Sequence, residues 1–380
     1  MLPSLSIHST SSTRVKILLK VLFQNHTVRR FNEGLISGLR DMGHQVDAFW
    51  HKHVFDSLWE LGTPAIRPMA HSILDVKNFG GPAKESEVIH LNDPLDGELG
   101  VVAKIERRPL VVTLHGTPVD HREGAGGGMK GILTYRLRYA YLSLLHDLGA
   151  RVTVQSQFCA RSLWSYSHIP ARVIYNGVET DVFTPGRQRG YLQGALGIPS
   201  TNKVVLWVGR GHQIKDPFTF LTAAEAVARK RSDTSFVMLL WYKGPLDDQI
   251  EDFVKGSEVL RRSLHFVRKI PWTQMPEAYA SSDLVVHTSP REGFGNAVSE
   301  AMSSGRAVIA ADRGGPSEYI QDGGLLFKSG DRDDLREKME CLLSDDGRRK
   351  GLGESARRIA CANLSWDRAA AEYSEVYGLG

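Results

Sequence analysis

Short apolar runs alternate with amphipathic stretches along most of this chain. In the first half, such runs predict buried strands at 15–23, 45–49, 88–91, 110–114, 152–155 and 173–175. Apolar residues recur at helical spacing between or beside these strands, at 31–42, 97–105, 133–148 and 158–165. Strands that alternate with helices in this way predict a parallel sheet covered by helices on both faces.

A second series of the same kind follows a turn-rich passage at 176–186, and a last helix is predicted at 366–377 with Ser365 as its N-cap. A chain of 380 residues is too long for one ordinary core, so two doubly wound Rossmann-like domains are expected to face each other across an active-site cleft. The strands of the second series are predicted at 204–208, 236–240, 264–266, 284–287 and 307–310. The predicted parts are a flexible leader at 1–14, domains at 15–180 and 181–365, and a C-terminal helix at 366–380 that packs back on the first domain.

The composition is that of a soluble globular protein, with 42% apolar and 24% charged residues. Lys and Arg exceed Asp and Glu by only 47 to 43, which favours an anionic small molecule or a lipid surface over nucleic acid as partner. The three cysteines lack metal-ligand spacing, so no metal site is expected, and a reducing cytoplasm is indicated. No apolar run approaches the roughly 20 residues that cross a bilayer, so a cytoplasmic protein without a transmembrane segment is predicted.

The most informative stretch runs from 283 to 327. Residues 284–287 read as a short strand, and Gly293-Phe294-Gly295 makes a turn that opens a helix at about 297–304. Glycine lets the backbone come close to a ligand, and the unpaired amides of a helix N-terminus favour phosphate. The stretch therefore predicts an anion site.

Glu292 and Glu300 flank this turn. On one continuous helix, residues eight positions apart would point about 80° apart around the axis and would not form a pair. If Glu292 lies on the turn instead, both carboxylates can face a ligand that lies over the helix N-terminus. Ionised carboxylates only accept hydrogen bonds, so the expected partners are the hydroxyl groups of a sugar and of a ribose.

The run from Arg291 to Ile309 resembles the E-x7-E signature of the retaining glycosyltransferases of family four, which have the GT-B fold. The resemblance implies that Glu292 contacts the sugar of a nucleotide diphosphate sugar donor and that Glu300 contacts its ribose. It is strongest from 173 to 327, moderate around His115 and weak from 1 to 79. The donor-binding residues that it implies in this stretch are Glu292, Gly293, Phe294, Gly295, Asn296, Ala297 and Glu300.

Two further segments are similar to motifs of this family. Gly209, Arg210 and Lys215 follow the predicted strand at 204–208. An isolated surface Arg or Lys is usually only solvated, but a planar guanidinium and a mobile ammonium suit a diphosphate, and the resemblance implies that Arg210 and Lys215 clamp it. His115 and Gly116 follow the strand at 110–114; a lone histidine is usually structural, yet the resemblance implies a contact with the donor sugar.

Other segments are less specific. Asp120 and His121 are candidate acceptor contacts or bases, Asn176-Gly177 is either a hinge turn or part of the cleft lining, and Glu318 is expected to pack or cap. The Gly-x-Gly-x-x-Gly match at 126–131 does not follow a strand directly, which favours a loop over a nicotinamide site. The next helix is compatible with a peripheral contact at the inner membrane face or with a solvated flank, because it carries Lys130, Tyr135, Arg136, Arg138, Tyr139 and Tyr141.

These motifs predict a metal-independent retaining glycosyltransferase of the hexosyltransferase class. It would move a hexosyl-type sugar from a nucleotide diphosphate sugar to a glycan, lipid-linked or small-molecule acceptor, with no cofactor. A sugar-nucleotide epimerase or hydrolase, and a non-catalytic sugar-nucleotide-binding subunit, are the alternatives. The passage at 22–30 departs from the Gly-Gly loop that many family members carry after the first strand. The predicted catalytic residues are His115, Arg210, Lys215 and Glu292.

Overall fold

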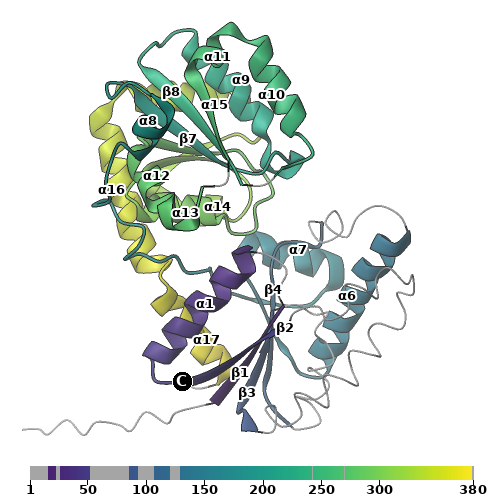
Figure 1. Ribbon diagram of the computed structural model, residues 1–380. Coiled ribbons are helices and arrows are strands. Elements are labelled where there is room, and N and C mark those ends of the chain that lie inside the picture. The colour runs from purple at the N-terminus through teal and green to yellow at the C-terminus, as the bar shows by residue number, and fades with distance from the viewer. Residues whose placement is uncertain are drawn as a thin grey trace, which may run out of the picture. The chain divides into compact units, whose positions relative to one another are not determined.

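The computed structural model describes residues 16–22, 26–51, 85–92, 107–119, 129–241, 243–268 and 270–378. Contacts along the chain define two compact units (Figure 1). The first unit comprises Met1–Leu114, Ala125–Thr153 and Ala370–Gly380, and the second comprises His115–Gly124 and Val154–Ala369.

The first sheet of the described part has the strand order β2-β1-β3-β4-β5-β6. β1 pairs in parallel with β2 and β3, and β3 pairs in parallel with β4. The order reverses between β1 and β3, so the sheet is doubly wound, as the alternating pattern predicts. Its strands are β1 (Lys16–Leu22), β2 (Gln45–His51), β3 (Val88–Leu91), β4 (Leu110–Leu114), β5 (Arg151–Val154) and β6 (Arg172–Val173).

The helices predicted beside these strands, and the last helix, are confirmed where the structure describes them. The first two begin earlier than their predicted ranges, at His26 and Met129. The helix predicted at 97–105 lies outside the described residues. The observed helices are α1 (His26–Asp41), α6 (Met129–Asp147), α7 (Gln157–Ser167) and α17 (Trp366–Tyr377).

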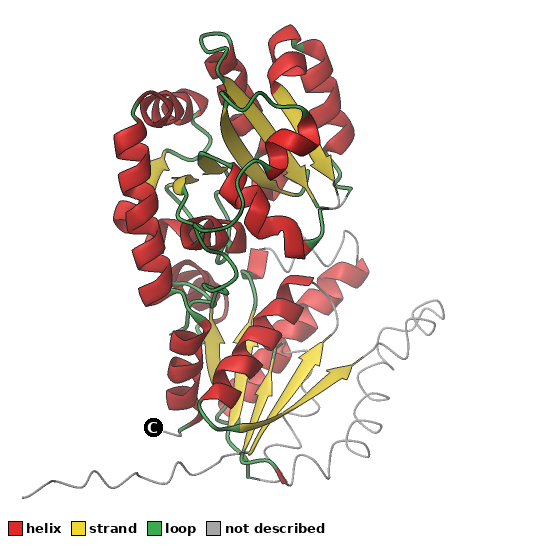
Figure 2. Ribbon diagram, turned by 60° about the vertical axis from the view of Figure 1, so that its left-hand side comes forward, coloured by secondary structure: helices red, strands yellow, loops and turns green. Residues whose placement is uncertain are grey.

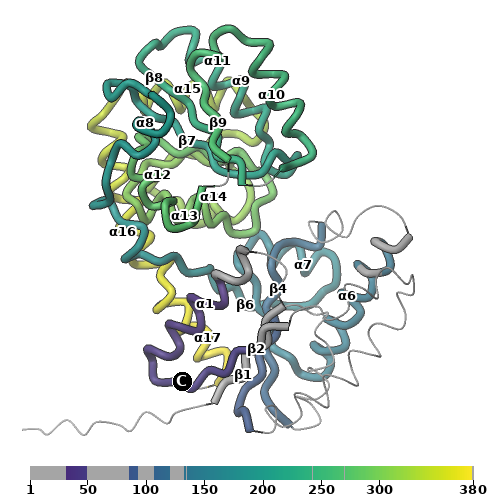
Figure 3. Tube along the Cα trace, in the orientation of Figure 1, coloured from purple at the N-terminus to yellow at the C-terminus, as the bar shows by residue number. Residues whose placement is uncertain are grey.

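A buried polar network holds the end of α17 in the first unit. On β3, Nδ1 of His90 lies 2.8 Å from the hydroxyl oxygen of Tyr377. Nε2 of the same ring lies 2.6 Å from the hydroxyl oxygen of Thr113. Thr113 in turn lies 3.0 Å from the hydroxyl of Tyr373. The ring of Phe31 on α1 meets the ring of Tyr373 edge-on, so helices from opposite ends of the chain lie side by side (Figure 3).

The second sheet has the order β12-β11-β10-β7-β8-β9, and its neighbouring strands are parallel. The five strands predicted in the second series are confirmed. β12 was not predicted, because its apolar run is short and begins with Gly324, and Leu326 is 40% exposed. The strands are β7 (Lys203–Gly209), β8 (Thr234–Leu240), β9 (Leu264–Arg268), β10 (Leu284–His287), β11 (Ala307–Ala311) and β12 (Gly324–Phe327).

Helices cover both faces of this sheet (Figure 2). Residues of β7 alternate between the two buried layers, with Leu206 and Val208 in one and Val205 and Trp207 in the other. Burial on both faces explains the nearly continuous apolar run of this strand. One layer includes α8 (Tyr191–Leu196), α12 (Met275–Ser281), α13 (Asn296–Ser303), α14 (Pro316–Tyr319) and α16 (Asp346–Asn363). The other includes α9 (Pro217–Ala228), α10 (Asp247–Gly256), α11 (Glu258–Ser263) and α15 (Arg332–Ser344).

The N-cap of α15 gives a stability prediction. The carboxylate of Asp331 accepts hydrogen bonds from the amides of Asp333 and Asp334 at 3.2 and 3.1 Å. Asp331→Ala leaves these amides without that partner, so it should lower the free energy of unfolding by about 1 kcal/mol. Thermal and urea denaturation measure the change. Asp333→Ala, which removes a side chain that is 76% exposed in the same turn, is the matched control; an equal loss in both variants would contradict the capping role.

Candidate functional site

The second sheet reverses its strand order between β7 and β10. The chain leaves β7 toward β8 and leaves β10 toward β11, in opposite directions. In doubly wound sheets, ligands bind outside the carboxyl ends of the strands at such a switch point. The segments that begin there contain Arg210 and Lys215 after β7 and Glu292 after β10.

Two buried hydroxyl groups tie these segments together. Thr288 donates to the carbonyl of Lys215 at 2.7 Å, and Ser289 donates to the carbonyl of Ile214 at 2.6 Å. The indole N–H of Trp207 on β7 donates to Thr288 at 3.0 Å. The short 3-10 helix Gln213–Lys215 is thereby fixed to the segment that carries Glu292.

The side chains of Lys215, His287 and Glu292 form a cluster at this edge of the sheet. The ammonium of Lys215 donates a hydrogen bond to Oε2 of Glu292, and Nε2 of His287 lies 3.5 Å from the same oxygen. Burial alone would raise the pKa of Glu292, but Lys215 and His287 outweigh it and hold this pKa well below its ordinary value. The carboxylate is therefore ionised at neutral pH. It stays within reach of a ligand, because 19% of the side chain is exposed.

The segment 314–319 forms hydrogen bonds with the loop from Glu292 to Gly295. The amide of Gly315 donates to the carbonyl of Glu292 at 2.7 Å, and the hydroxyl of Tyr319 donates to the carbonyl of Phe294 at 2.7 Å. The approach is so close that a Cβ atom on Gly315 would lie 2.1 Å from the carbonyl oxygen of Gly293. The backbone of segment 314–319 thus packs directly on the backbone of the loop, and this close approach requires glycine at position 315.

The helix α13 begins at this loop without a side-chain cap. Its N-cap residue Gly295 has φ +87°, a left-handed conformation that favours glycine, and a Cβ there would lie 2.7 Å from the ring of Pro316. Among the described residues, no side chain caps this helix, whose first two amides are those of Asn296 and Ala297. These amides can bind an anion.

Glu300 lies on the second turn of α13 and is 5% exposed. The hydroxyl of Tyr279 on α12 donates to its Oε2 at 2.9 Å. Glu292 thus lies on the turn before the helix and Glu300 on the helix itself. The two residues therefore do not lie on one continuous helix, and both are near the N-terminus of α13.

His115 and Gly116 follow β4 and belong to the second unit. Nδ1 of His115 is hydrogen-bonded to the side-chain amide of Gln155, which follows β5. Gly116 has φ +91°, and a Cβ on Gly293 would lie 3.4 Å from the Cα of Gly116. The structure therefore brings the His115 segment to the loop after β10.

The other residues predicted from the sequence lie at the end of β7, near Trp366 or outside the described ranges. Gly209 ends β7 against the ring of Trp207, where a Cβ would lie 2.6 Å from the ring. Arg210 is exposed directly after this strand, and its side chain forms no ion pair or hydrogen bond with other described residues. Gly177 packs under Trp366, whose ring lies 2.2 Å from a Cβ placed there. Asp120 and His121 lie outside the described residues.

Several residues of the site were not found from the sequence. His287, Thr288 and Ser289 stand at or just after the end of β10, and Gln155 stands just after β5. The available signal was their position at the carboxyl end of a predicted parallel strand, where ligands bind. Glu318, for which packing or capping was expected, accepts hydrogen bonds from the amides of Gln157 and Phe158 and so caps α7.

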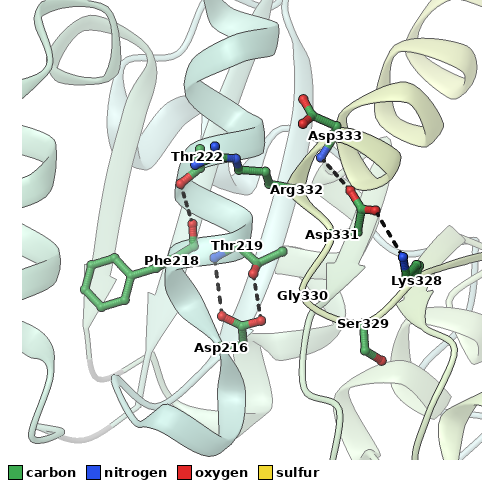
Figure 4. A pocket seen from close by; sticks show the side chains of 10 residues that line it. All are labelled: Asp216, Phe218, Thr219, Thr222, Lys328, Ser329, Gly330, Asp331, Arg332 and Asp333. Carbon is green, nitrogen blue, oxygen red and sulfur yellow. Dashed lines mark hydrogen bonds and ion pairs between the residues drawn. The ribbon is translucent and has the colours of Figure 1, made fainter.

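A separate polar cavity of about 540 Å³ lies beside the start of α9 (Figure 4). Asp216 and Asp331 in its wall cap α9 and α15, and the ring of Phe218 points away from Asp331. These two carboxylates already serve helix amides. None of the predicted site residues lines this cavity. Its lining consists of Asp216, Phe218, Thr219, Thr222, Lys328, Ser329, Gly330, Asp331, Arg332 and Asp333.

Among the described residues, no group of three or more His, Cys, Asp or Glu side chains is placed to hold a metal ion. Within the same ranges, no helix combines the length and the apolar character needed to span a membrane.

Two family models match the chain one after the other. The model described as Glycosyltransferase Family 4 matches residues 28–182, and the model described as Glycosyl transferases group 1 matches residues 191–359. The first match contains the strands from β2 to β6, and the second contains those from β7 to β12. The chain belongs to glycosyltransferase family four. In this family member, the residues that match the Glycosyl transferases group 1 model include Arg210, Lys215, Glu292 and Glu300.

Curated relatives share part of this sequence. A D-inositol 3-phosphate glycosyltransferase of Corynebacterium diphtheriae is 33% identical over 213 residues, which are 54% of this chain and 50% of that protein. The chain thus spans about half the length of the relatives of this kind that it matches. An uncharacterized glycosyltransferase of Methanocaldococcus jannaschii is 25% identical over 369 residues, which are 91% of this chain and 92% of that protein.

Solved structures show the same GT-B fold. A glycosyltransferase from Rickettsia africae matches with a TM-score of 0.76 and 18% identity over 96% of this chain and 98% of that one. HepE of Anabaena, in complex with UDP-glucose, matches with a TM-score of 0.71 and 20% identity over 96% of this chain and all of that one (100%). Two parallel-sheet α/β domains, the fold expected from the sequence, are therefore confirmed.

Proposed function

We propose that this family member is a retaining, metal-independent glycosyltransferase. It moves a hexosyl-type sugar from a nucleotide diphosphate sugar to a glycan, lipid-linked or small-molecule acceptor in the cytoplasm. The observation that carries the proposal is the convergence of Lys215, Glu292 and the uncapped start of α13 at the switch point of the second sheet. HepE, of the same fold, has been solved with UDP-glucose, which supports a nucleotide sugar as donor.

In this proposal the donor lies across the start of α13. The amides of Asn296 and Ala297, together with Arg210 and Lys215, hold the diphosphate. Glu300 accepts hydrogen bonds from the ribose, and Glu292 accepts them from the sugar. His115 contacts the sugar from the side of Gly116 and Gln155, where the structure places its segment next to Gly293.

The reaction breaks the bond between the sugar and the diphosphate, so negative charge develops on the leaving phosphate. Lys215 is fixed through its carbonyl to Thr288 and through its ammonium to Glu292, so it needs no reorganisation to meet that charge. Arg210 adds a second positive charge, and these two groups take the role that a divalent cation has in other transferases. The acceptor attacks from the face that the phosphate leaves, and the phosphate takes its proton, so the configuration is retained.

Product analysis with labelled donors tests this function. A panel of sugar nucleotides is first screened by thermal shift, because a ligand stabilises the folded state by an amount that grows with the logarithm of its concentration over its dissociation constant. The best donor is then incubated with acceptors in the presence of EDTA, and the products are identified by mass spectrometry and proton NMR. A glycosylated acceptor that keeps the anomeric configuration of the donor is expected. An epimerised donor, or free sugar as the main product, would contradict the proposal.

Glu300→Ala should weaken the binding of the donor's nucleoside diphosphate by about 1–3 kcal/mol, because the variant removes hydrogen bonds to the ribose. Isothermal titration calorimetry measures the change. Asp322→Ala, which removes an exposed carboxylate elsewhere in the second unit, is the control. Equal affinity in Glu300→Ala and wild type would refute the ribose contact.

A further inference from the structure

Glu318 completes the N-terminus of α7. One carboxylate oxygen accepts the amide of Gln157 at 2.8 Å, and the other accepts the amide of Phe158 at 2.6 Å. Ser156, the N-cap residue, accepts the amide of Cys159 at 3.1 Å. The first three amides of the helix are thus satisfied, two of them by a residue far away in the sequence.

The carboxylate of Glu318 is held firmly in place. The hydroxyl of Tyr175 donates to its Oε2 at 3.1 Å, and Arg161 on α7 lies 3.4 Å from its Oε1. Burial, and next to it the negative charge of Glu318, raise the pKa of Tyr175 to about 12, so this hydroxyl keeps its proton and donates throughout the physiological range. The side chain of Glu318 is only 13% exposed.

Glu318 stands on the short segment that supports the donor loop. Gly315 and Tyr319, on either side of it, donate to the carbonyls of Glu292 and Phe294. Glu318 therefore belongs to the same short segment whose hydrogen bonds hold the loop that carries Glu292.

The same loop also contacts α7 and Gln155, which lies two residues before the start of α7. Sγ of Cys159 lies 3.8 Å from the carbonyl oxygen of Gly293, and a Cβ on Gly293 would lie 3.5 Å from the side-chain oxygen of Gln155. Gln155 in turn holds the ring of His115. All these residues belong to the second unit. α7 and Gln155 therefore connect Glu318 with His115, the residue proposed to contact the sugar.

We propose that Glu318 is a positioning residue for sugar transfer. By fixing α7 to the segment 314–319, it sets the position of His115 and Gln155 relative to Gly293 and Glu292, and hence the position of the sugar relative to the diphosphate site. This proposal rests on the proposed function. It predicts that the loss of Glu318 impairs transfer far more than the binding of the nucleoside diphosphate, which uses Lys215, Glu300 and the α13 amides.

The test compares Glu318→Ala and Glu318→Gln with Ser156→Ala. Ser156→Ala removes a cap of the same helix without touching the segment 314–319, so it reports the effect of α7 stability alone. Turnover, KM for the best donor of the panel and the affinity for its nucleoside diphosphate are measured for each variant. Glu318→Ala should lower kcat about 10- to 100-fold, as a small misplacement of reacting groups does, and change the nucleoside diphosphate affinity less than about threefold. Glu318→Gln, which keeps one acceptor oxygen, should recover part of the loss.

A second measurement needs no ligand or activity. Cys159 is buried against Gly293, whereas Cys361 is exposed and serves as an internal reference for alkylation. Labelling of Cys159 by iodoacetamide, followed by peptide mass spectrometry, should rise about tenfold or more in Glu318→Ala relative to Cys361, because local opening exposes the thiol. It should rise less in Glu318→Gln.

Three outcomes of the kinetic and binding measurements would overturn the proposal. They are an unchanged kcat in Glu318→Ala, an equal loss of kcat in Ser156→Ala, and a loss of nucleoside diphosphate affinity as large as the loss of kcat. Unchanged labelling of Cys159 would also overturn it, because Glu318 would then not hold α7 to the donor loop. A wild-type protein that binds no sugar nucleotide would instead contradict the proposed function, and the labelling experiment separates the two failures.

Discussion

Replacing Lys215 by methionine should lower the rate of sugar transfer about 10²- to 10³-fold, the usual effect of removing one fixed group that stabilises a developing negative charge. Methionine keeps the length of the side chain and removes its charge. The variant loses the contact with the leaving diphosphate and leaves Glu292 with His287 as its remaining partner in the cluster. Steady-state kinetics with the donor identified by the panel measure the loss.

Lys255→Met is the matched control, because Lys255 is 68% exposed on α10. The pair also has a pH signature. In the folded protein, the pKa of Glu292 lies below its ordinary value of 4.5. The ionised carboxylate therefore stabilises the folded state fully above pH 4.5, and this stabilisation is lost as the pH falls through the pKa of the folded state. The stability difference between wild type and Lys215→Met should therefore narrow below about pH 4.5. A turnover within threefold of wild type would contradict the role of Lys215.

Gly315→Ala should disrupt the donor loop even though alanine fits the backbone conformation of this residue. The dihedral angles of Gly315 are helical, at φ −57° and ψ −41°. Its added Cβ would lie 2.1 Å from the carbonyl oxygen of Gly293, so two backbone segments must move apart. We expect the free energy of unfolding to fall by about 1–3 kcal/mol, as in other overpacked sites. Donor affinity should fall at least tenfold, because the hydrogen bond to the carbonyl of Glu292 is strained.

Gly351→Ala is the control for this substitution. Gly351 lies within α16, and no atom comes within 4 Å of a Cβ placed there. Alanine is the better helix former, so this variant should gain up to about 1 kcal/mol of stability. Donor binding by Gly315→Ala that equals the binding of Gly351→Ala would show that the close contact with Gly293 does not shape the site.

Strands with both faces buried were predictable from the sequence, because each is a short run of apolar residues between turn-rich segments. β7 and β10 are examples. β12 was missed, because it begins at Gly324 and leaves Leu326 at the surface. The choice of neighbours within each sheet follows from pairing between distant strands, which no local pattern contains.

The site was predictable where one short stretch carries it. Glu292, the glycine turn and Glu300 lie on one strand–turn–helix segment, so a sequence of nine residues contains their chemistry. The pairing of Lys215 with Glu292 joins residues 77 positions apart and depends on β7 and β10 being neighbours. His287 was assigned only to a strand, because nothing in the sequence shows that its ring faces Glu292. The hold of Glu318 on α7 depends likewise on tertiary structure.

Calorimetric titration with ADP, GDP and UDP, and with the matching monophosphates, tests the proposed diphosphate site. At least one nucleoside diphosphate should bind with 1:1 stoichiometry in EDTA, about tenfold or more tighter than its monophosphate, because charged hydrogen bonds hold the second phosphate. This preference should disappear in Lys215→Met. Equal affinity for diphosphates and monophosphates, or a preference that survives in Lys215→Met, would show that Lys215 does not hold a diphosphate at this site.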